Sequence, residues 1–254
     1  MVLPGPRVKG LSIKEEGGRQ LEYRCNGLAA WYVTLLTAFL LHISGIFRIT
    51  QIFDQFGSLM TVAIIAGDVI AVIIYISAFY FGKATRVSGN FIYDFFMGIY
   101  LNPRVGNLDI KMWAEIRVSW TILFLLTVST AVKQYEVYGV VTTPMYFMVL
   151  AHGLYANACQ KGEECIPTTW DISYECFGWM LCYWNLAGVA FVYCFQSMFI
   201  YHRGPDFDLG KPVTYALFLT LLLAYYVWDT SNAQKNRFRM QRIGTFFERP
   251  LAFP

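Results

Sequence analysis

The stretch Tyr215-Ala-Leu-Phe-Leu-Thr-Leu-Leu-Leu-Ala-Tyr-Tyr-Val-Trp228 is almost entirely apolar, and it runs directly into Asp229-Thr-Ser-Asn-Ala-Gln-Lys-Asn-Arg-Phe-Arg239. We expect a membrane helix to end here and a cationic, amide-rich helix to begin. At 100° per residue, two amides and two cations project from one face of that second helix: Asn232, Lys235, Asn236 and Arg239. Such a face suits an anionic, hydrogen-bonding ligand. A basic patch that touches only lipid headgroups is the open alternative.

The composition of the whole chain is typical of a membrane protein. Of its 254 residues, 56% are hydrophobic and only 15% are charged, whereas about a quarter are charged in soluble domains. Five further stretches are candidate membrane spans: Leu28–Phe47, Leu59–Phe81, Val118–Val132, Val141–Ala158 and Phe177–Tyr201. The sequence therefore predicts an all-α, polytopic membrane helix bundle with about six transmembrane helices. Polar residues interrupt Val141–Ala158, so a sheltered or re-entrant helix remains an alternative there.

The lysines and arginines predict the orientation of this bundle. If all six segments cross, most of the 20 basic residues fall on the side that holds both chain ends, which places the termini in the cytosol. We expect a cytosolic tail over residues 1–27, a transmembrane bundle over 28–230 and a cytosolic segment over 231–254. The turn-forming residues of Gly5–Gly10 indicate a turn-rich tail rather than a phosphate-binding loop.

Several common functional motifs are absent from the sequence. No Gly-x-Gly-x-x-Gly pattern enters a helix, and the histidines stand far apart without carboxylates at metal-ligand spacing. We therefore expect no Rossmann domain, no metal site and no nucleic-acid partner. Cys159 and Cys165 flank a short loop and are able to pair, but a cytosolic location disfavours a stable disulfide. A small apolar role is expected for Cys176, Cys182 and Cys194.

A polar stripe is predicted along the fifth span. Thr168-Thr-Trp-Asp171 has the spacing of a capping box, and no obvious stop follows before Tyr201, so we expect one long helix. For part of this stripe, two explanations are equally good: the polar side chains form hydrogen bonds to neighbouring helices, or they have a functional role. For Asp171 and Glu175, near the membrane boundary, a functional role is favoured. Two neighbouring carboxyl groups differ in pKa, so one of them is able to hold a proton. The stripe consists of Asp171, Glu175, Gly178, Asn185, Tyr193 and Gln196.

Two further features are chemically informative. Asp68 lies in the middle of an apolar segment, where an ionised carboxylate is costly and usually functional. A hydrogen-bonded residue that faces the bundle is the alternative that we favour. The aromatic-rich run Asn90–Arg104, followed by Asp109–Glu115, is best interpreted on physical grounds as an interfacial aromatic belt.

Four blocks of this sequence resemble the membrane-bound sterol reductase family, and they occur in that family's order. The family includes the C-14, C-7 and C-24(28) reductases and the lamin B receptor. Further stretches, such as Trp31–Leu35 and Trp184–Gly188, look most like the members that reduce the C-24(28) double bond of an ergosterol precursor. The four blocks are Tyr93–Gly98, Leu101–Arg104 with Asp109–Met112, Trp170–Gly178 and Asn232–Arg239.

The resemblance implies a multi-pass enzyme of the endoplasmic reticulum membrane that uses NADPH in the last step of ergosterol biosynthesis. Lys235 and Arg239 would bind the phosphates of the cofactor, with Asn232 beside them. Cofactor binding is therefore favoured over a basic patch that contacts only lipid headgroups. The implied partners are a sterol substrate and membrane lipid. Other enzymes of sterol biosynthesis are further candidate partners.

The chemistry of alkene reduction narrows the roles of the polar stripe. An unactivated alkene accepts a hydride only after a proton has reached its less substituted carbon, which leaves a tertiary cation. Asp171, Glu175 and Tyr193 are the candidate proton donors, with the two carboxyl groups ranked first. Aromatic rings nearby would stabilise the cation through their faces.

The chain also departs from the family pattern. Family members are longer, so the chain looks truncated at both ends, and Gly244–Pro254 does not resemble the family's continuation. We therefore expect an incomplete cofactor site and doubtful activity. A non-catalytic sterol-binding or scaffold protein and a reductase of the C-14 or C-7 double bond remain alternatives. A small transporter that uses Asp68 is disfavoured because no internal symmetry is visible.

Overall fold

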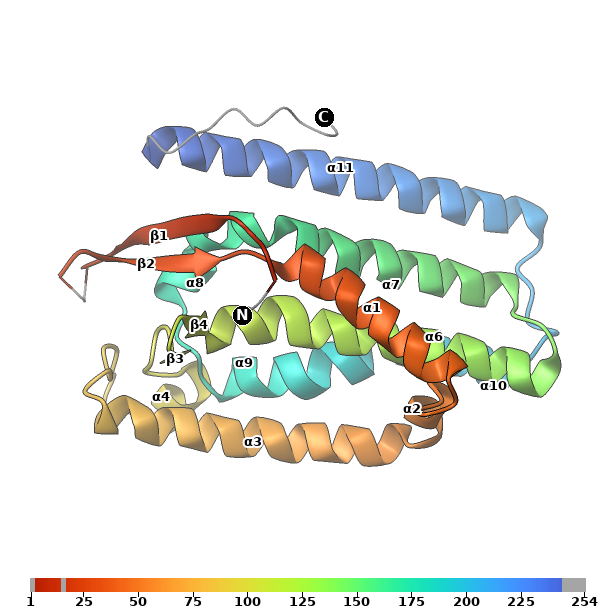
Figure 1. Ribbon diagram of the computed structural model, residues 1–254, viewed down its shortest axis with the longest axis horizontal. Helices are drawn as coiled ribbons and strands as arrows, with labels where there is room; N and C mark the ends of the chain where they lie inside the picture. The colour runs from red at the N-terminus through yellow and green to blue at the C-terminus, as the bar shows by residue number, and fades with distance from the viewer. Residues whose placement is uncertain (1–2, 15–16, 244–254) are drawn as a thin grey trace. The chain divides into compact units, whose positions relative to one another are not determined.

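The structure is a computed structural model that describes residues 3–14 and 17–243, and these residues are mostly helical (Figure 1). The chain divides into two compact units, Met1–Asp208 and Leu209–Pro254. The Gly244–Pro254 segment, whose sequence departs from the family pattern, lies outside the described residues. Each unit is considered by itself below.

The first unit contains four short strands and a series of helices. The strands are β1 Arg7–Ile13, β2 Arg19–Arg24, β3 Arg104–Val105 and β4 Leu108–Asp109. The α-helices are α1 Gly27–Ile43, α2 Thr50–Asp54, α3 Phe56–Tyr80, α4 Phe91–Met97, α5 Ile110–Trp113, α6 Ser119–Tyr138, α7 Thr143–Lys161, α8 Trp170–Tyr174, α9 Trp179–Tyr183 and α10 Phe195–Arg203. Two π-helical segments, η2 Ala114–Val118 and η4 Trp184–Val192, and one 3-10 segment, η3 Gly162–Thr168, connect them.

The strands correct the prediction of an all-α chain with a turn-rich tail. β1 and β2 form an antiparallel hairpin in which Val8 pairs with Tyr23. Leu21 and Tyr23, two residues apart on β2, are buried together with Ile13 of β1. This alternation places one face of the hairpin against the core of the first unit, where Ile172 of α8 contributes to the same cluster. Apolar residues recur at every second position in this region, which is typical of a strand, and the sequence analysis did not use this pattern.

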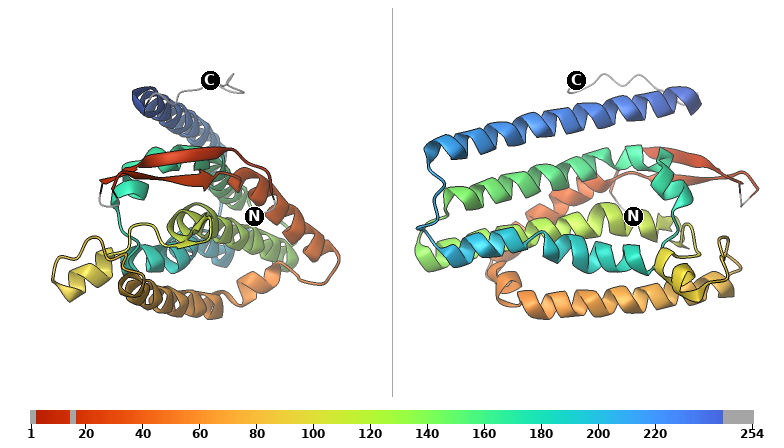
Figure 2. Two further views of the ribbon diagram at one scale, coloured as in Figure 1. Left: turned by 60° about the vertical axis from the view of Figure 1, so that its left-hand side comes forward. Right: turned by 180° about the vertical axis from the view of Figure 1, so that it is seen from behind.

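Helix α6 forms the centre of the first unit. It packs against α7, η4 and α2, and Figure 2 shows it alongside α7 and the η4–α10 segment from two further sides. Leu123 and Leu126 of α6 are almost fully buried against Ala190 and Phe191 of η4. The buried hydroxyl groups of Thr127, Ser129 and Thr130 donate to carbonyl oxygens of α6 itself, and that of Ser119 donates to the Ala114 carbonyl oxygen of η2. Thr127 also lies within hydrogen-bond distance of His152 on α7, at 2.7 Å.

Helices occupy all six predicted spans, but three helices are long and apolar enough to cross a membrane within the described residues. These are Phe56–Tyr80, Ile110–Tyr138, which joins α5, η2 and α6, and Lys211–Arg242. Helix α1 is apolar but shorter. A bundle of membrane helices is therefore supported, whereas six crossings and cytosolic termini remain predictions. The polar residues within α7 and the broken fifth segment explain the difference.

The predicted capping box of the fifth segment is not formed. Thr169 is the N-cap of α8, and its side chain does not cap the helix. The hydroxyl groups of Thr168 and Thr169 instead donate to the carbonyl oxygens of Cys165 and Ile166. Both threonines thus stabilise the end of η3 rather than the start of a long helix.

The single long helix from Asp171 to Tyr201 is also wrong. α8 ends at Tyr174, an extended stretch follows, and helix α9 starts only at Trp179. The backbones of Gly98 and Gly178 lie so close that a side chain on either would overlap the other, and the Phe177 N–H donates to the Tyr100 carbonyl oxygen at 2.9 Å. The chain leaves the helical path here to pair with the segment after α4, so the predicted stripe is not one continuous face.

No disulfide joins the six cysteines, all of which lie within the described residues. Cys176, Cys182 and Cys194 are buried, as a small apolar role requires, although the Cys194 thiol also donates to the Leu123 carbonyl oxygen at 3.4 Å. Cys159 and Cys165, whose pairing was disfavoured, form no disulfide.

The second unit contains the helix α11, Lys211–Ile243, which has 33 residues. Its length of about 50 Å exceeds the roughly 30 Å of a hydrocarbon core. The apolar stretch Tyr215–Trp228 therefore fits inside a membrane while the following turns extend beyond it. The helix continues without interruption through Arg239, which confirms that Asn232, Lys235 and Arg239 lie on one helix face.

Candidate functional site

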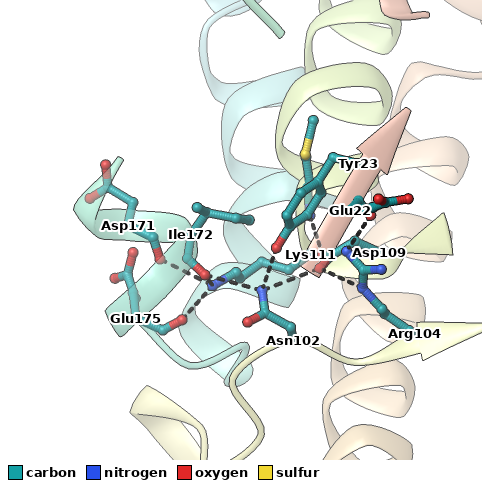
Figure 3. A network of polar contacts seen from close by, with 10 residues as sticks. Glu22, Tyr23, Asn102, Arg104, Asp109, Lys111, Asp171, Ile172 and Glu175 are labelled. Atoms are coloured by element: carbon teal, nitrogen blue, oxygen red, sulfur yellow. Dashed lines mark hydrogen bonds and ion pairs between the residues drawn. The ribbon is translucent and has the colours of Figure 1, made fainter. Parts of the chain in front are cut away.

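A fully buried lysine lies at the centre of the polar network in the first unit (Figure 3). Lys111 belongs to α5, whose first turn is capped by the Asp109 side chain through the Met112 N–H at 3.0 Å. The Lys111 ammonium donates to the carbonyl oxygens of Asp171, Ile172 and Glu175 at 3.1, 3.0 and 2.5 Å. An ammonium group has three donors, and here each finds an acceptor.

These contacts explain why α8 ends where it does. The last carbonyl groups of a helix have no partner within it, and a cation is favourable at that end. Lys111 donates to two carbonyl oxygens of α8, those of Asp171 and Ile172, and to that of Glu175 just after it, while the Arg86 guanidinium donates to the Tyr174 carbonyl oxygen. The C-terminal end of this five-residue helix is therefore fixed by two cations from other parts of the chain.

A second layer of the network joins the loop after α4 to the N-terminal hairpin. The Asn102 amide donates to the Ile172 carbonyl oxygen at 3.1 Å and to an Asp109 carboxylate oxygen at 3.2 Å. Arg104 lies 3.4 Å from the same carboxylate, and its guanidinium is 4.6 Å from the centre of the Tyr23 ring. Burial is the main cause that raises the pKa of Tyr23, and the Asp109 charge adds to it.

The network changes the interpretation of the aromatic-rich run. Ile99, Leu101, Asn102 and Asp109 are buried inside the first unit, so this part of the run is not an interfacial belt. Two of the blocks that carry the family resemblance, the one at Leu101–Met112 and the one at Trp170–Gly178, are in direct contact through Lys111 and Asn102.

The two carboxyl groups ranked first as proton donors come together at this site. Their main-chain oxygens hold Lys111, whereas Figure 3 shows both carboxylates pointing away from its ammonium. The Asp171 side chain is exposed and that of Glu175 is half-buried. Burial raises the pKa of Glu175, Lys111 opposes this change, and the Asp171 charge reinforces it. Glu175 is thus the carboxyl group of the pair that its surroundings favour in the protonated form.

Tyr193, the third candidate donor, lies elsewhere. It follows η4, is 39% exposed and packs its ring against Trp184. The helical residues of α9 and η4 separate it from Glu175 by about 15–20 Å along the helix axis. Asn185 of the predicted stripe accepts a hydrogen bond from Ser119 at 3.3 Å, which confirms interhelical hydrogen bonding for that residue. Gln196 is exposed.

An ion pair that the sequence interpretation missed lies next to this network. Glu163 is buried, and its carboxylate accepts from Arg117 at 2.6 Å and from the Gly27 N–H at 2.6 Å. Burial raises the pKa of Glu163, and Arg117 lowers it. Gly27 begins α1, and a side chain there would overlap this carboxylate, so the site holds the N-terminus of α1 in place. In the sequence, the only local indication of this ion pair is the glycine at the start of an apolar helix.

A small pocket lies between the two networks. It has a volume of about 30 Å³ and is lined by Tyr23, Asp109, Trp113, Arg117 and Glu163 among others. This volume accommodates about one water molecule, so the pocket is too small for a sterol or a nucleotide.

Asp68 is hydrogen-bonded, as expected, but it does not face the bundle. Its carboxylate accepts from the Trp179 indole N–H at 2.7 Å, while its side chain is exposed on the outer side of α3.

The candidate cofactor residues lie on α11 in the second unit. Lys235 is exposed, and Asn232 and Arg239 are half-buried. The Asn232 amide donates to the Trp228 carbonyl oxygen one turn earlier at 2.9 Å, which orients its side chain along the helix. Two cationic side chains one turn apart on the same face match the spacing and charge that phosphate groups require.

Comparison with known proteins gives a consistent result. A sequence model of the ergosterol biosynthesis ERG4/ERG24 family matches residues 1–253. The chain is 45% identical over 251 residues to delta(24(24(1)))-sterol reductase erg4A of Aspergillus fumigatus, covering 98% of this chain and 53% of the relative. It is 46% identical over 245 residues to the delta(24(24(1)))-sterol reductase of Gibberella zeae, covering 96% and 41%. The delta(14)-sterol reductase of Dictyostelium discoideum is 36% identical over 255 residues, covering 99% and 55%. The chain thus spans about half the length of the curated relatives that it matches.

Proposed function

The chain belongs to the ERG4/ERG24 family of ergosterol biosynthesis, and from this we propose that it acts in the NADPH-dependent reduction of the C-24(28) double bond of an ergosterol precursor. One observation carries the choice of double bond. Identity to the two delta(24(24(1)))-sterol reductases is 45% and 46%, whereas identity to the Dictyostelium delta(14)-sterol reductase is 36%. We further propose the last step of ergosterol synthesis as its place and the endoplasmic reticulum membrane, crossed several times, as its location.

The helix face on α11 is the proposed contact with the cofactor. Lys235 and Arg239 would bind phosphate oxygens, with Asn232 as a neutral donor beside them. Arg239 is suited to engage two oxygens at once, whereas Lys235 acts as a point charge. When bound, NADPH supplies the hydride that the reduction consumes.

Glu175 is the proposed proton donor for the alkene. Because burial raises the pKa of its carboxyl group, this side chain retains a proton more readily than an exposed glutamate does. Delivery of that proton to the less substituted alkene carbon leaves a tertiary cation on the other carbon. Asp171 reinforces the protonated state of Glu175 through its charge and is the second candidate, and Tyr193 is the third.

Two other functions remain as outcomes of the test below. A reductase of the C-14 double bond is the first alternative, since the chain is also 36% identical to the Dictyostelium delta(14)-sterol reductase, and a C-7 reductase belongs to the same class of chemistry. A non-catalytic sterol-binding or scaffold protein would keep the helix bundle and dispense with the cofactor face.

The test is sterol analysis in a yeast strain that lacks its own C-24(28) reductase. Membranes that contain this chain extended with the C-terminal part of the Aspergillus fumigatus relative should convert the C-24(28)-unsaturated precursor to ergosterol, whereas the chain alone should convert little of it. Lys235→Ala or Arg239→Ala should lower this conversion about tenfold, because each removes a charged hydrogen bond to a phosphate.

The matched control is Arg237→Ala, which removes a cation of the same helix from a different face and should leave conversion unchanged. Accumulation of a C-14- or C-7-unsaturated sterol that the chain consumes would reassign the double bond. No conversion of any sterol by the extended protein would favour the non-catalytic alternative.

A further inference from the structure

The one charged residue of helix α3 lies at the middle of the helix. Asp68 is the thirteenth of the 25 residues of Phe56–Tyr80, so about 18 Å of helix lies on either side of it. Half of a hydrocarbon core is about 15 Å, which places Asp68 near the bilayer centre. An ionisable side chain at that depth is costly and usually serves a function.

Asp68 lies beside a close contact between two helices. Gly67 is buried, and a side chain there would lie 3.1 Å from the Tyr183 Cα of α9. With Ala71 also buried, α3 presents small residues four apart, which lets the two backbones approach. The Asp68 side chain stands at the exposed edge of this contact and reaches the Trp179 indole N–H at 2.7 Å.

A hydrogen bond that only joined α3 to α9 would not need a carboxylate. One carboxylate oxygen accepts the Trp179 N–H, and within residues 3–14 and 17–243 this is the only hydrogen bond that Asp68 makes. The second oxygen makes no hydrogen bond within these residues, so it is available as an acceptor for a ligand that carries a donor.

Aromatic rings surround this acceptor on the same outer face. The Trp179 ring stacks on Tyr183 with centroids 5.0 Å apart and packs against Phe96 at 5.7 Å. Phe96 is 42% exposed, so the rings present apolar surface outward. A ligand for this place must dissolve in the membrane, carry one hydrogen-bond donor and have a rigid apolar body.

We infer that Asp68 and Trp179 form an intramembrane sterol subsite on the outer face of α3 and α9. The free Asp68 oxygen accepts a hydrogen bond from the sterol hydroxyl group, and Trp179, Tyr183 and Phe96 pack against the ring system. The inference rests on the proposed function because it takes a sterol as the substrate class. It goes beyond that function by assigning the sterol hydroxyl to a residue outside the proposed reaction site.

Sterol binding to the purified chain in lipid nanodiscs tests this subsite without requiring any turnover. Two photoreactive sterols are compared, one with a free 3β-hydroxyl group and one in which a methyl ether replaces it. The wild-type chain should bind the hydroxysterol about tenfold more tightly than the ether, because only the hydroxyl group donates a hydrogen bond to the Asp68 oxygen. Crosslinks should map to α3 and α9.

Asp68→Ala should weaken hydroxysterol binding about tenfold and leave binding of the ether unchanged. Ile73→Ala is the matched control, since Ile73 is exposed on α3 but points about 140° away from Asp68 and should affect neither sterol. The comparison of the two sterols on the wild-type chain remains decisive if the Asp68 variant fails to fold.

Equal binding of the two sterols to the wild-type chain would overturn the subsite, and so would an Asp68→Ala variant that keeps the hydroxyl preference. Either result would assign this face to contact with another helix. Hydroxyl-selective binding without sterol conversion in yeast would leave the subsite standing and contradict the proposed function. Sterol conversion without hydroxyl-selective binding would support the proposed function and contradict the subsite.

Discussion

The Trp170–Tyr201 region and helix α11 are both segments in which polar residues follow a helical period, yet only one forms the helix that its period predicts. α11 runs without a break from Lys211 to Ile243. The Trp170–Tyr201 region instead breaks into α8, an extended stretch, α9, η4 and α10. Period alone therefore does not decide the fold of a polar membrane segment.

The difference lies in what competes for the backbone hydrogen bonds. Around α8, the carbonyl oxygens that a longer helix would use are taken by Lys111 and Arg86, and the Phe177 N–H is taken by Tyr100. On α11 the polar side chains are compatible with the helix, as the Asn232 bond to the Trp228 carbonyl oxygen shows. Buried partners from distant parts of the chain redirect the first region, whereas the second follows local rules.

The largest effect on this contrast should come from Lys111→Met. The substitution keeps an apolar side chain of similar length but leaves three carbonyl groups without their shared donor. Leaving a buried carbonyl group without its donor costs about 1–3 kcal/mol, so we expect a marked fall in the Tm of the detergent-solubilised protein. The signal of a folded α8 region, such as protection of the Glu175 and Phe177 amides from exchange, should be lost first.

Lys9→Met serves as the control for Lys111→Met. Lys9 is exposed on β1, and its loss should change stability by less than about 0.5 kcal/mol. If Lys111→Met and Lys9→Met had the same Tm, the buried lysine would not be what ends α8.

A smaller effect is expected on the pH dependence of the Tm, which reports the protonation of Glu175. Burial raises its pKa above the ordinary 4.5, so the folded protein binds this proton more tightly than the unfolded chain does. The resulting stabilisation is complete below about pH 4.5 and is lost as the pH rises through the raised pKa. Glu175→Gln, which stays neutral, should therefore lose less Tm than the wild type between about pH 4 and about pH 7.5. Identical pH profiles would show that Glu175 titrates as an exposed group.

The sequence predicted the local features well and the long-range ones poorly. The α11 face and the helical spans follow from hydropathy and period. The break at Gly178 was not predictable, because it depends on the backbone of Gly98. The burial of Lys111 was equally hidden, since its acceptors lie about 60 residues away in the chain. The family resemblance identified both blocks but not their contact.

The most direct test of the proposed reductase is the binding of NADPH to the purified chain, measured by titration calorimetry. The double variant Lys235→Ala with Arg239→Ala should bind about a hundredfold more weakly than the wild type, since each charged contact contributes about tenfold. Its Tm and the affinity of Arg237→Ala should match the wild type. Equal NADPH affinity in the wild type and the double variant would contradict the assignment of this α11 face to the cofactor.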